Sequence, residues 1–137
     1  MCSSDLSAVR IVVLDAGMTE LIRPAMYGAW HRVTGLTSLG RLVDDPVSAV
    51  PASPAPALGV APARVDGPVC ESTDTFGTHD LPPLRRGDLV AIADAGAYAA
   101  SMASTYNGRP TAPQVLLEAD GRLVLGRRRG RALTTGR

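Results

Sequence analysis

The sequence predicts a mainly β domain, a Greek-key sandwich or an open barrel, with one or two short helices. A nearly continuous apolar and β-branched run lies at residues 9–15, and a second apolar run lies at residues 89–93. The third observation is a hairpin pattern at residues 113–126, where two apolar runs flank Asp120-Gly121. A length of 137 residues suits one domain with one hydrophobic core.

The first predicted element is a strand over residues 9–15, VRIVVLD, which Gly17 ends. Its apolar character is typical of a strand that is buried on both faces. A short helical turn is expected within residues 19–30, because Pro24 restricts the backbone of the residue before it. Arg23 and Tyr27 are four residues apart and would share one side of that turn.

The middle of the chain, residues 44–63, is predicted as a surface loop because prolines and small residues dominate it. We therefore expect a domain at residues 7–126 with this Pro/Ala-rich insertion, and an Arg-rich tail at residues 127–137. Residues 1–6, MCSSDL, are expected to be a non-native or disordered N-terminus. One back-translation of them matches the end of a common sequencing adapter.

The second half of the chain continues with short elements. Residues 81–94 contain a Gly87-Asp88 turn followed by a strand. The alanine-rich residues 95–108 suit a short helix that stops at Asn107-Gly108. The Asp120-Gly121 dipeptide then predicts the turn of the hairpin.

Composition argues against several classes of function. A formal net charge of +1 offers no steering towards nucleic acid, an acidic substrate or a membrane surface. All fourteen basic residues are arginine, so a mechanism that needs a lysine amine is closed to this chain alone. Cys2 and Cys70 make no disulfide framework, and no apolar run approaches the about 20 residues of a membrane-spanning helix. We therefore expect a cytoplasmic protein.

Cys70 and Glu71 are the first candidate site residues. They lie in GPVCESTDTFG, residues 67–77, between a Gly-Pro break and a polar stretch. A free cysteine is most often a buried apolar residue. A carboxylate close to a thiol disfavours the thiolate, however, and leaves a neutral thiol that can deliver a proton. Both interpretations stay open on these residues alone.

Arg23, Tyr27 and Tyr98 are the second set of candidates. A guanidinium and a hydroxyl on one side of a helical turn can bind a carboxylate, although a solvated arginine beside a packed tyrosine is more common. Tyr98, at the start of the predicted helix, could contact a phosphate or pack in the core. His31 and His79 have no partners at metal-ligand spacing, so no metal site is predicted.

Three blocks of sequence resemble, in order, the diaminopimelate decarboxylase family of fold-type III pyridoxal-phosphate enzymes. The blocks are VVLDAGMTELIRPAMYGAWH, GPVCESTDTFGTHDLPPLRRGDLVAIADAGAYAASMASTYNGRP and PQVLLE. This family joins an N-terminal barrel, which carries the cofactor lysine, to a C-terminal β domain, and it works as a homodimer with active sites at the interface. The resemblance implies that this chain is the β domain without the barrel.

The resemblance also implies a role for each candidate. Cys70 would donate the proton that completes the reaction, across the dimer interface, and Glu71 would contact the distal amino group of the substrate. Arg23 and Tyr27 would hold the distal carboxylate. Tyr98 would contact the substrate and the phosphate of the cofactor, pyridoxal 5'-phosphate. The small-molecule substrate would be meso-diaminopimelate, which the family converts into L-lysine and CO2.

The chain alone is expected to be inactive, because the family binds its cofactor through a lysine Schiff base and this sequence has no lysine. Three explanations compete: a gene fragment, the β half of a split decarboxylase, and a non-catalytic β module for dimerisation or interaction. An isolated domain would also expose an apolar face that the barrel covers.

A different substrate class also stays open. The alternative is a domain of an ornithine- or arginine-type decarboxylase. Ornithine-type decarboxylases similarly carry the cysteine, but usually follow it with Asp-Gly. Glu71-Ser72, together with the Arg23 carboxylate clamp, favours the diaminopimelate branch.

Overall fold

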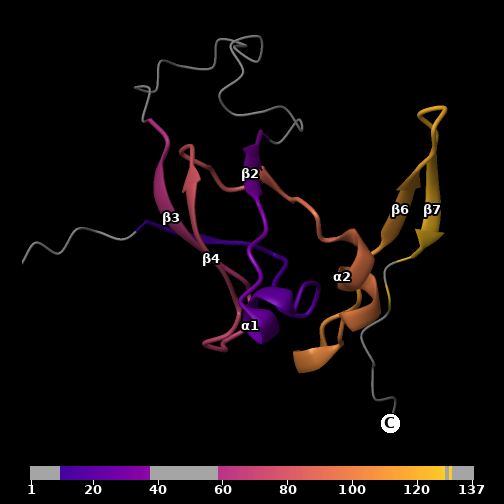
Figure 1. Cartoon of the computed structure of the whole chain (residues 1–137), viewed down its shortest axis with the longest axis horizontal. Coiled ribbons are helices and arrows are strands. Elements are labelled where there is room, and N and C mark those ends of the chain that lie inside the picture. The colour runs from indigo at the N-terminus through magenta and orange to yellow at the C-terminus, as the bar shows by residue number, and fades with distance from the viewer. Residues whose placement is uncertain (1–9, 38–58, 129, 131–137) are drawn as a thin grey trace, which may run out of the picture.

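The computed structural model describes residues 10–37, 59–128 and 130. Within these residues the chain forms mostly short strands with two short α-helices, as Figure 1 shows. The elements are β1 (Arg10–Val13), α1 (Arg23–Tyr27), β2 (Val33–Leu36), β3 (Ala61–Asp66), β4 (Thr75–Leu81), β5 (Leu89–Ile92), α2 (Gly96–Met102), the 3-10 helix η2 (Tyr106–Gly108), β6 (Gln114–Leu117) and β7 (Leu123–Arg127).

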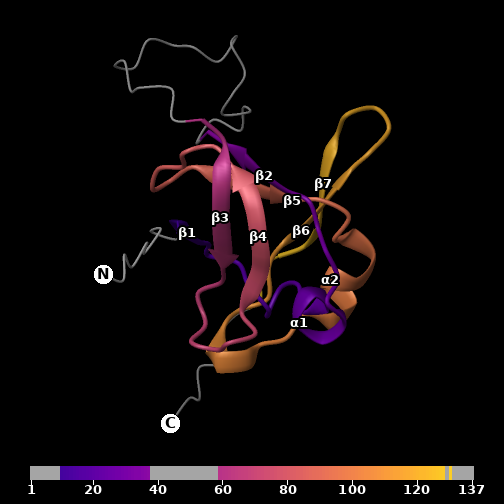
Figure 2. The same ribbon diagram turned by 60° about the vertical axis from the view of Figure 1, so that its left-hand side comes forward.

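The strands form three open sheets rather than a closed barrel. The order is β1-β3-β4 in the first sheet, β2-β5 in the second and β6-β7 in the third. In the first sheet β1 pairs with β3 in parallel and β4 pairs with β3 in antiparallel fashion, so β3 is the central strand. Figure 2 shows β3 and β4 side by side, with β2 and β5 crossing near their upper ends. The mainly β class with short helices is therefore confirmed.

The hydrophobic core lies where β2, β3 and β4 meet the start of α1. Val65 of β3 and Leu81 of β4 are almost fully buried. Together the core cluster comprises Leu21, Val33, Ala63, Val65, Phe76 and Leu81. Every second residue of β3 from Ala63 faces this cluster, as expected for a strand with one buried face.

Two strands of this core were not predicted from the sequence, and each has a physical reason. β4 carries a bulge, because Val65 pairs with Gly77 while Asp66 pairs with Thr75. Gly77 adopts a φ of 89°, and this irregularity disrupts the apolar-polar alternation that marks a strand. β2 is only four residues long and includes Gly35, so its pattern is too short to recognise.

The first strand lies where it was predicted, but its expected burial on both faces is wrong. Ile11 is 58% exposed and Val13 is 66% exposed, whereas Val12 and Leu14 pack against the core. β1 is an edge strand, and one of its faces is uncovered in this chain. Arg10 anchors its start, since its Nη2 donates to the carbonyl oxygens of Leu81 and Pro82 at 2.5 and 3.1 Å.

The predicted loop and termini fall largely outside the described residues. This holds for residues 1–6, for residues 44–58 of the Pro/Ala-rich insertion, and for most of the tail beyond residue 128. The last part of the predicted loop is described, and there β3 already begins at Ala61.

The helix predicted at residues 95–108 is shorter than expected. α2 ends at Met102, because Ala103 takes an extended backbone with ψ of 143°. Asn107 and Gly108, the predicted stop signal, instead have positive φ within the separate 3-10 helix η2. The hairpin is confirmed: β6 pairs with β7, Leu117 lies opposite Leu123, and Gly121 has a φ of 84°.

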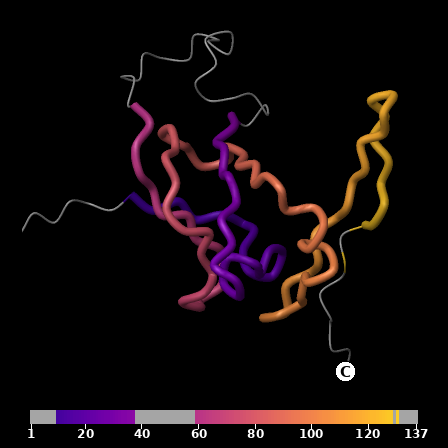
Figure 3. The backbone as a smooth tube through the Cα atoms, viewed as in Figure 1, coloured from indigo at the N-terminus to yellow at the C-terminus, as the bar shows by residue number. Residues whose placement is uncertain are grey.

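The segments that carry the predicted site residues gather at one end of the molecule. Figure 3 traces the backbone through α1, the turn between β3 and β4, and η2, which all lie in the lower part of the view, below β2. Figure 2 shows η2 next to the β3–β4 turn. Among the described residues, no helix has the length and apolar character required to cross a membrane.

The core position of Leu81 generates a first prediction. Leu81→Ala removes a side chain that is 1% exposed, so the free energy of unfolding should fall by about 2–5 kcal/mol. Leu123→Ala, at a site 69% exposed, makes the same change of residue and should cost less than about 0.5 kcal/mol. Guanidinium unfolding midpoints of both variants and the parent chain check this. Equal midpoints for the two variants would contradict the conclusion that Leu81 lies in the core and Leu123 outside it.

Candidate active site

The turn between β3 and β4, residues 67–74, carries Cys70 and Glu71. It is closed by backbone hydrogen bonds from Gly67 N to Asp74 O at 2.8 Å and from Asp74 N to Glu71 O at 3.0 Å. Glu71 N also donates to Val69 O at 2.8 Å. These bonds hold the turn tightly while Cys70 and Glu71 stay exposed at its surface.

Cys70 has a free and exposed thiol. The side chain of Val69, next to it, is buried and anchors this part of the turn. The interpretation of Cys70 as a buried apolar residue is therefore wrong, and its thiol is accessible to a reactant.

Glu71 has a hydrogen-bond partner that no sequence pattern indicates. The hydroxyl of Tyr106 donates to Glu71 Oε1 at 2.5 Å, across a separation of 35 residues. This bond raises the pKa of Tyr106, and the negative charge of Glu71 raises it further, because a phenolate would lose the hydrogen bond and face that charge. The bond joins the exposed Glu71 carboxylate to η2.

Tyr106 lies in η2, which is held against the loop that follows β1. Ser104 N donates to Thr19 O at 2.9 Å. Arg109 donates through Nη2 to Asp15 O at 2.5 Å and lies 3.9 Å from Glu20 Oε1. No local pattern marks Tyr106 as a site residue, because its partner comes from a distant turn.

The second group of candidates lies on α1 and α2. Arg23 and Tyr27 are the first and last residues of α1, as their spacing predicted, and Pro24 occupies the first turn, where its missing N–H costs no hydrogen bond. Gly28 ends the helix in the left-handed conformation with φ of 59°. Tyr27 is 61% exposed.

Tyr98 of α2 lies directly beside Arg23. The Arg23 Cζ is 4.9 Å from the centre of the Tyr98 ring, a cation–π contact that orients the guanidinium. The structure therefore brings together two candidates that are 75 residues apart in sequence, while more than half of the Tyr98 side chain stays accessible.

The candidates thus form two groups, Cys70-Glu71 and Arg23-Tyr27-Tyr98. Within the described residues, no hydrogen bond, ion pair or ring contact joins one group to the other. His31 and His79, by contrast, are buried packing residues whose ring nitrogens lie 3.1 Å from Ala93 O and 2.9 Å from Phe76 O.

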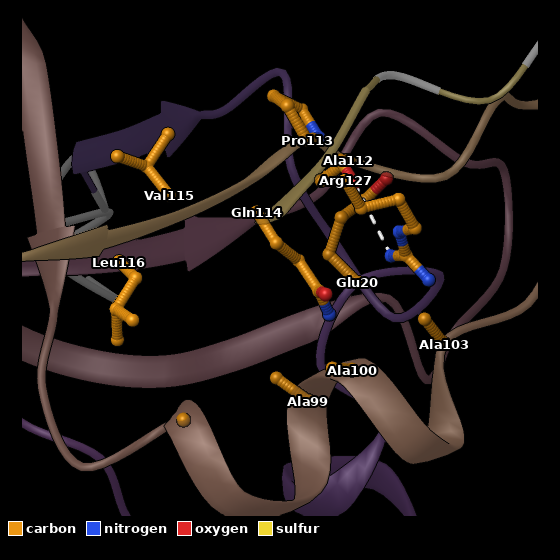
Figure 4. Close-up of a pocket in the computed structure, with 11 residues that line it drawn as sticks. Glu20, Ala99, Ala100, Ala103, Ala112, Pro113, Gln114, Val115, Leu116 and Arg127 are labelled. Atoms are coloured by element: carbon orange, nitrogen blue, oxygen red, sulfur yellow. Dashed lines mark hydrogen bonds between the residues drawn. The ribbon is translucent and has the colours of Figure 1, made fainter. Parts of the chain in front are cut away.

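A separate cavity of about 520 Å³ lies between α2 and the β6–β7 hairpin. Figure 4 shows Ala99 and Ala100 of α2 below it, Gln114 pointing into it, and Arg127 bonded to Ala112 O at 3.2 Å. None of the predicted site residues lines this cavity. It is distinct from both groups of candidates.

One buried carboxylate holds the Cys70-Glu71 turn against the rest of the molecule. Asp74 is 3% exposed, and its Oδ2 accepts the backbone N–H of Val69 at 2.6 Å. Its Oδ1 accepts the N–H of Met18 at 2.6 Å, in the loop that leads into α1. Asp74 was not among the residues predicted from the sequence, because one aspartate in a polar turn carries no distinguishing pattern.

The mainly β arrangement in open sheets is that of a known class of domain. The family model for the C-terminal sheet domain of pyridoxal-dependent decarboxylases matches residues 3–96, and the chain belongs to this family.

Within this family the chain is similar to diaminopimelate decarboxylases. It is 40% identical over 126 residues to the diaminopimelate decarboxylase of Escherichia coli (strain K12), and the match covers 86% of this chain and 27% of that protein. A crystal structure of diaminopimelate decarboxylase matches with a TM-score of 0.76 and 36% identity, over 94% of this chain and 30% of that one.

The diaminopimelate decarboxylase of Helicobacter pylori, solved in complex with L-lysine, matches with a TM-score of 0.70 and 36% identity, over 90% of this chain and 26% of that one. The chain therefore spans between 26% and 30% of the length of these relatives.

The Glu71-Tyr106 contact generates a second prediction. Tyr106 should ionise at a higher pH than its ordinary value of 10.0, and Glu71→Gln should lower the pKa of Tyr106 because the negative charge is removed. The pKa of Tyr106 is measured by following the ultraviolet absorbance of phenolate against pH and subtracting the titration curve of a Tyr106→Phe variant. Glu118→Gln removes a carboxylate that is bonded to Arg122 instead, and it should leave the titration unchanged. An unchanged Tyr106 pKa in Glu71→Gln would contradict the contact.

Proposed function

We propose that this chain is the C-terminal β domain of a decarboxylase that converts meso-diaminopimelate into L-lysine and CO2. The observation that carries the proposal is the exposed Cys70 thiol beside Glu71, whose carboxylate Tyr106 holds in place. The similarity to diaminopimelate decarboxylases, one of which was solved with L-lysine bound, supports the same substrate class.

Pyridoxal 5'-phosphate, when bound, supplies the electron sink that lets a substrate lose CO2. Cys70 is proposed to deliver a proton from its thiol to the carbon that has lost the carboxyl group. Glu71 accepts a hydrogen bond from the distal ammonium group of the substrate. Tyr106 keeps one oxygen of Glu71 occupied, so the other oxygen is the one free to bind that ammonium.

The opposite end of the substrate is assigned to α1. Arg23 binds the distal carboxylate through its planar fork of N–H groups, and the exposed hydroxyl of Tyr27 adds a further donor. The Tyr98 ring supports the Arg23 guanidinium from one side, and its hydroxyl is proposed to contact the substrate and the phosphate of the cofactor.

The separation of the two groups supports a shared site between two copies of the longer protein. A substrate bound at Arg23 of one copy would then meet Cys70 and Glu71 of the other. This arrangement gives each group a partner that it lacks within the described part of one chain, and it makes the active protein a homodimer.

The chain alone is proposed to be inactive. Its residues fit a contact to the cofactor phosphate through Tyr98, but they offer no lysine for a Schiff base. Uncovered apolar side chains on β1 and on the β6–β7 hairpin, including Val13 and Leu123, support a domain that acts with the remaining part of a longer chain. The cytoplasmic location is part of the same proposal.

A fused protein tests this function. The segment of the Escherichia coli diaminopimelate decarboxylase that precedes the region of similarity is joined to this chain, and formation of lysine from meso-diaminopimelate is measured. The fused protein should be active, and the chain alone should not. Cys70→Ala should lower kcat by about 100-fold or more, because a positioned proton donor is lost. Cys2→Ser should have no effect.

Activity on other substrates, or on none, would refute the proposal, and mixing the separate parts tests for a split enzyme. Activity on ornithine or arginine, but not on meso-diaminopimelate, would place the chain in the other decarboxylase branch. Activity on simple mixing with the separate N-terminal segment would favour a split enzyme. A folded fused protein that has no activity on these substrates would favour a non-catalytic β module.

Arg23 supplies the fourth prediction. In the fused protein, Arg23→Lys keeps the charge but loses the two-donor fork, so KM for meso-diaminopimelate should rise by about 10-fold. Arg122→Lys alters an exposed arginine on the hairpin and should leave KM unchanged. Steady-state kinetics at matched protein concentrations measure both KM values. An unaltered KM in Arg23→Lys would show that Arg23 does not bind the distal carboxylate.

A further inference from the structure

We infer that Asp74 is a positioning residue that fixes the Cys70-Glu71 turn relative to the segment leading into α1. The catalytic role of Cys70 and Glu71 rests on the proposed function. The link between the two loops is independent of that function, because it consists of hydrogen bonds made by the buried Asp74 side chain.

The carboxylate of Asp74 joins two segments that are far apart in sequence. Its Oδ1 accepts Met18 N and its Oδ2 accepts Val69 N, each at 2.6 Å. Val69 directly precedes Cys70. Met18 belongs to the loop whose backbone continues through Leu21 into α1, and Leu21 N in turn donates to Gly17 O at 3.0 Å.

The space around the carboxylate is shaped to admit it. A Cβ added at Gly17 would overlap Asp74, lying 2.9 Å from its Cγ, and a Cβ added at Gly67 would overlap the same group. Both glycines let the backbone approach a side chain that is 3% exposed. Two glycines from separate loops, both close against one carboxylate, indicate a close fit rather than an incidental burial.

The bonds of Asp74 also explain how an exposed pair of residues can be ordered. Cys70 and Glu71 have no buried side-chain anchor of their own, since both are exposed. Their positions follow from the backbone on either side, where Val69 N binds the carboxylate and Asp74 N donates to Glu71 O. A shift of Asp74 would therefore move the thiol and the Glu71 carboxylate together.

Asp74→Asn is the informative substitution. Asparagine has nearly the same shape, but only one of its two terminal atoms accepts hydrogen bonds. Its NH2 group must face the N–H of either Met18 or Val69, so one side of the link is replaced by a repulsive contact. Asp88→Asn is the matched control, because Asp88 accepts a backbone N–H, that of Arg85, at 2.7 Å in a turn that holds no site residue.

In the fused protein, Asp74→Asn should lower kcat/KM by about 10- to 100-fold, the loss expected from a small misplacement of catalytic groups. KM should rise because Glu71 moves, and the solvent deuterium isotope effect on kcat should grow because proton delivery from Cys70 becomes slower. If Asp74 only stabilised the fold, kcat would fall in proportion to the folded fraction. KM and the isotope effect would then stay unchanged, and that result overturns the inference.

A second measurement needs no activity and uses the 137-residue chain itself. Asp74→Asn should speed amide hydrogen exchange at Met18 and Val69 without changing it at Val65, and it should lower the pKa of Tyr106 because Glu71 moves away. Asp88→Asn should change none of these. Unaltered exchange and an unaltered Tyr106 titration overturn the inference even if the fused protein is active.

The two measurements separate the possible failures. If the unsubstituted fused protein is inactive while exchange at Met18 and Val69 responds to Asp74→Asn, the proposed function fails and the link stands. Should Asp74→Asn not fold, Gly17→Ala displaces the same carboxylate by steric overlap and should give the same changes in exchange and titration. Wild-type behaviour of a folded Gly17→Ala variant would overturn the inference.

Discussion

The buried carboxylate of Asp74 is the interaction on which the arrangement of this domain end depends. A carboxylate removed from water is costly unless hydrogen bonds compensate it, and here two backbone N–H groups at 2.6 Å do so. These N–H groups belong to different loops, so the side chain can be satisfied only when both loops are in place. One carboxylate therefore links the turn that carries Cys70 to the loop that leads into α1, where Arg23 lies.

The loop between β1 and α1 serves as the common support. Besides Met18, which binds Asp74, it presents Thr19 O to the N–H of Ser104 and Asp15 O to Arg109. Through these contacts the C-terminal segment carries Tyr106 to the Cys70-Glu71 turn. Residues from three distant parts of the sequence therefore meet at one surface, although none of them belongs to the central strand β3.

The sequence could predict what depends on local spacing and little of what depends on distant contacts. The helical turn that carries Arg23 and Tyr27 was predicted because four residues span one turn, and the hairpin was predicted because Asp-Gly marks its turn. Tyr106 and Asp74 were missed because their partners lie 35 and 56 residues away, and neither polar residue stands out locally. β4 was missed because its bulge hides the alternation.

The wrong prediction for β1 carries information about the domain. Its apolar pattern is that of a strand covered on both faces, yet Ile11 and Val13 are exposed. Exposed apolar residues also occur on β6 and β7, including Leu117 and Leu125. Exposing so much apolar surface is unfavourable in water, so the pattern fits a larger assembly better than an isolated domain. The absence of lysine agrees with this, because the proposed proton donor and the proposed carboxylate clamp would have chemical use only where another segment supplies the group that holds the cofactor.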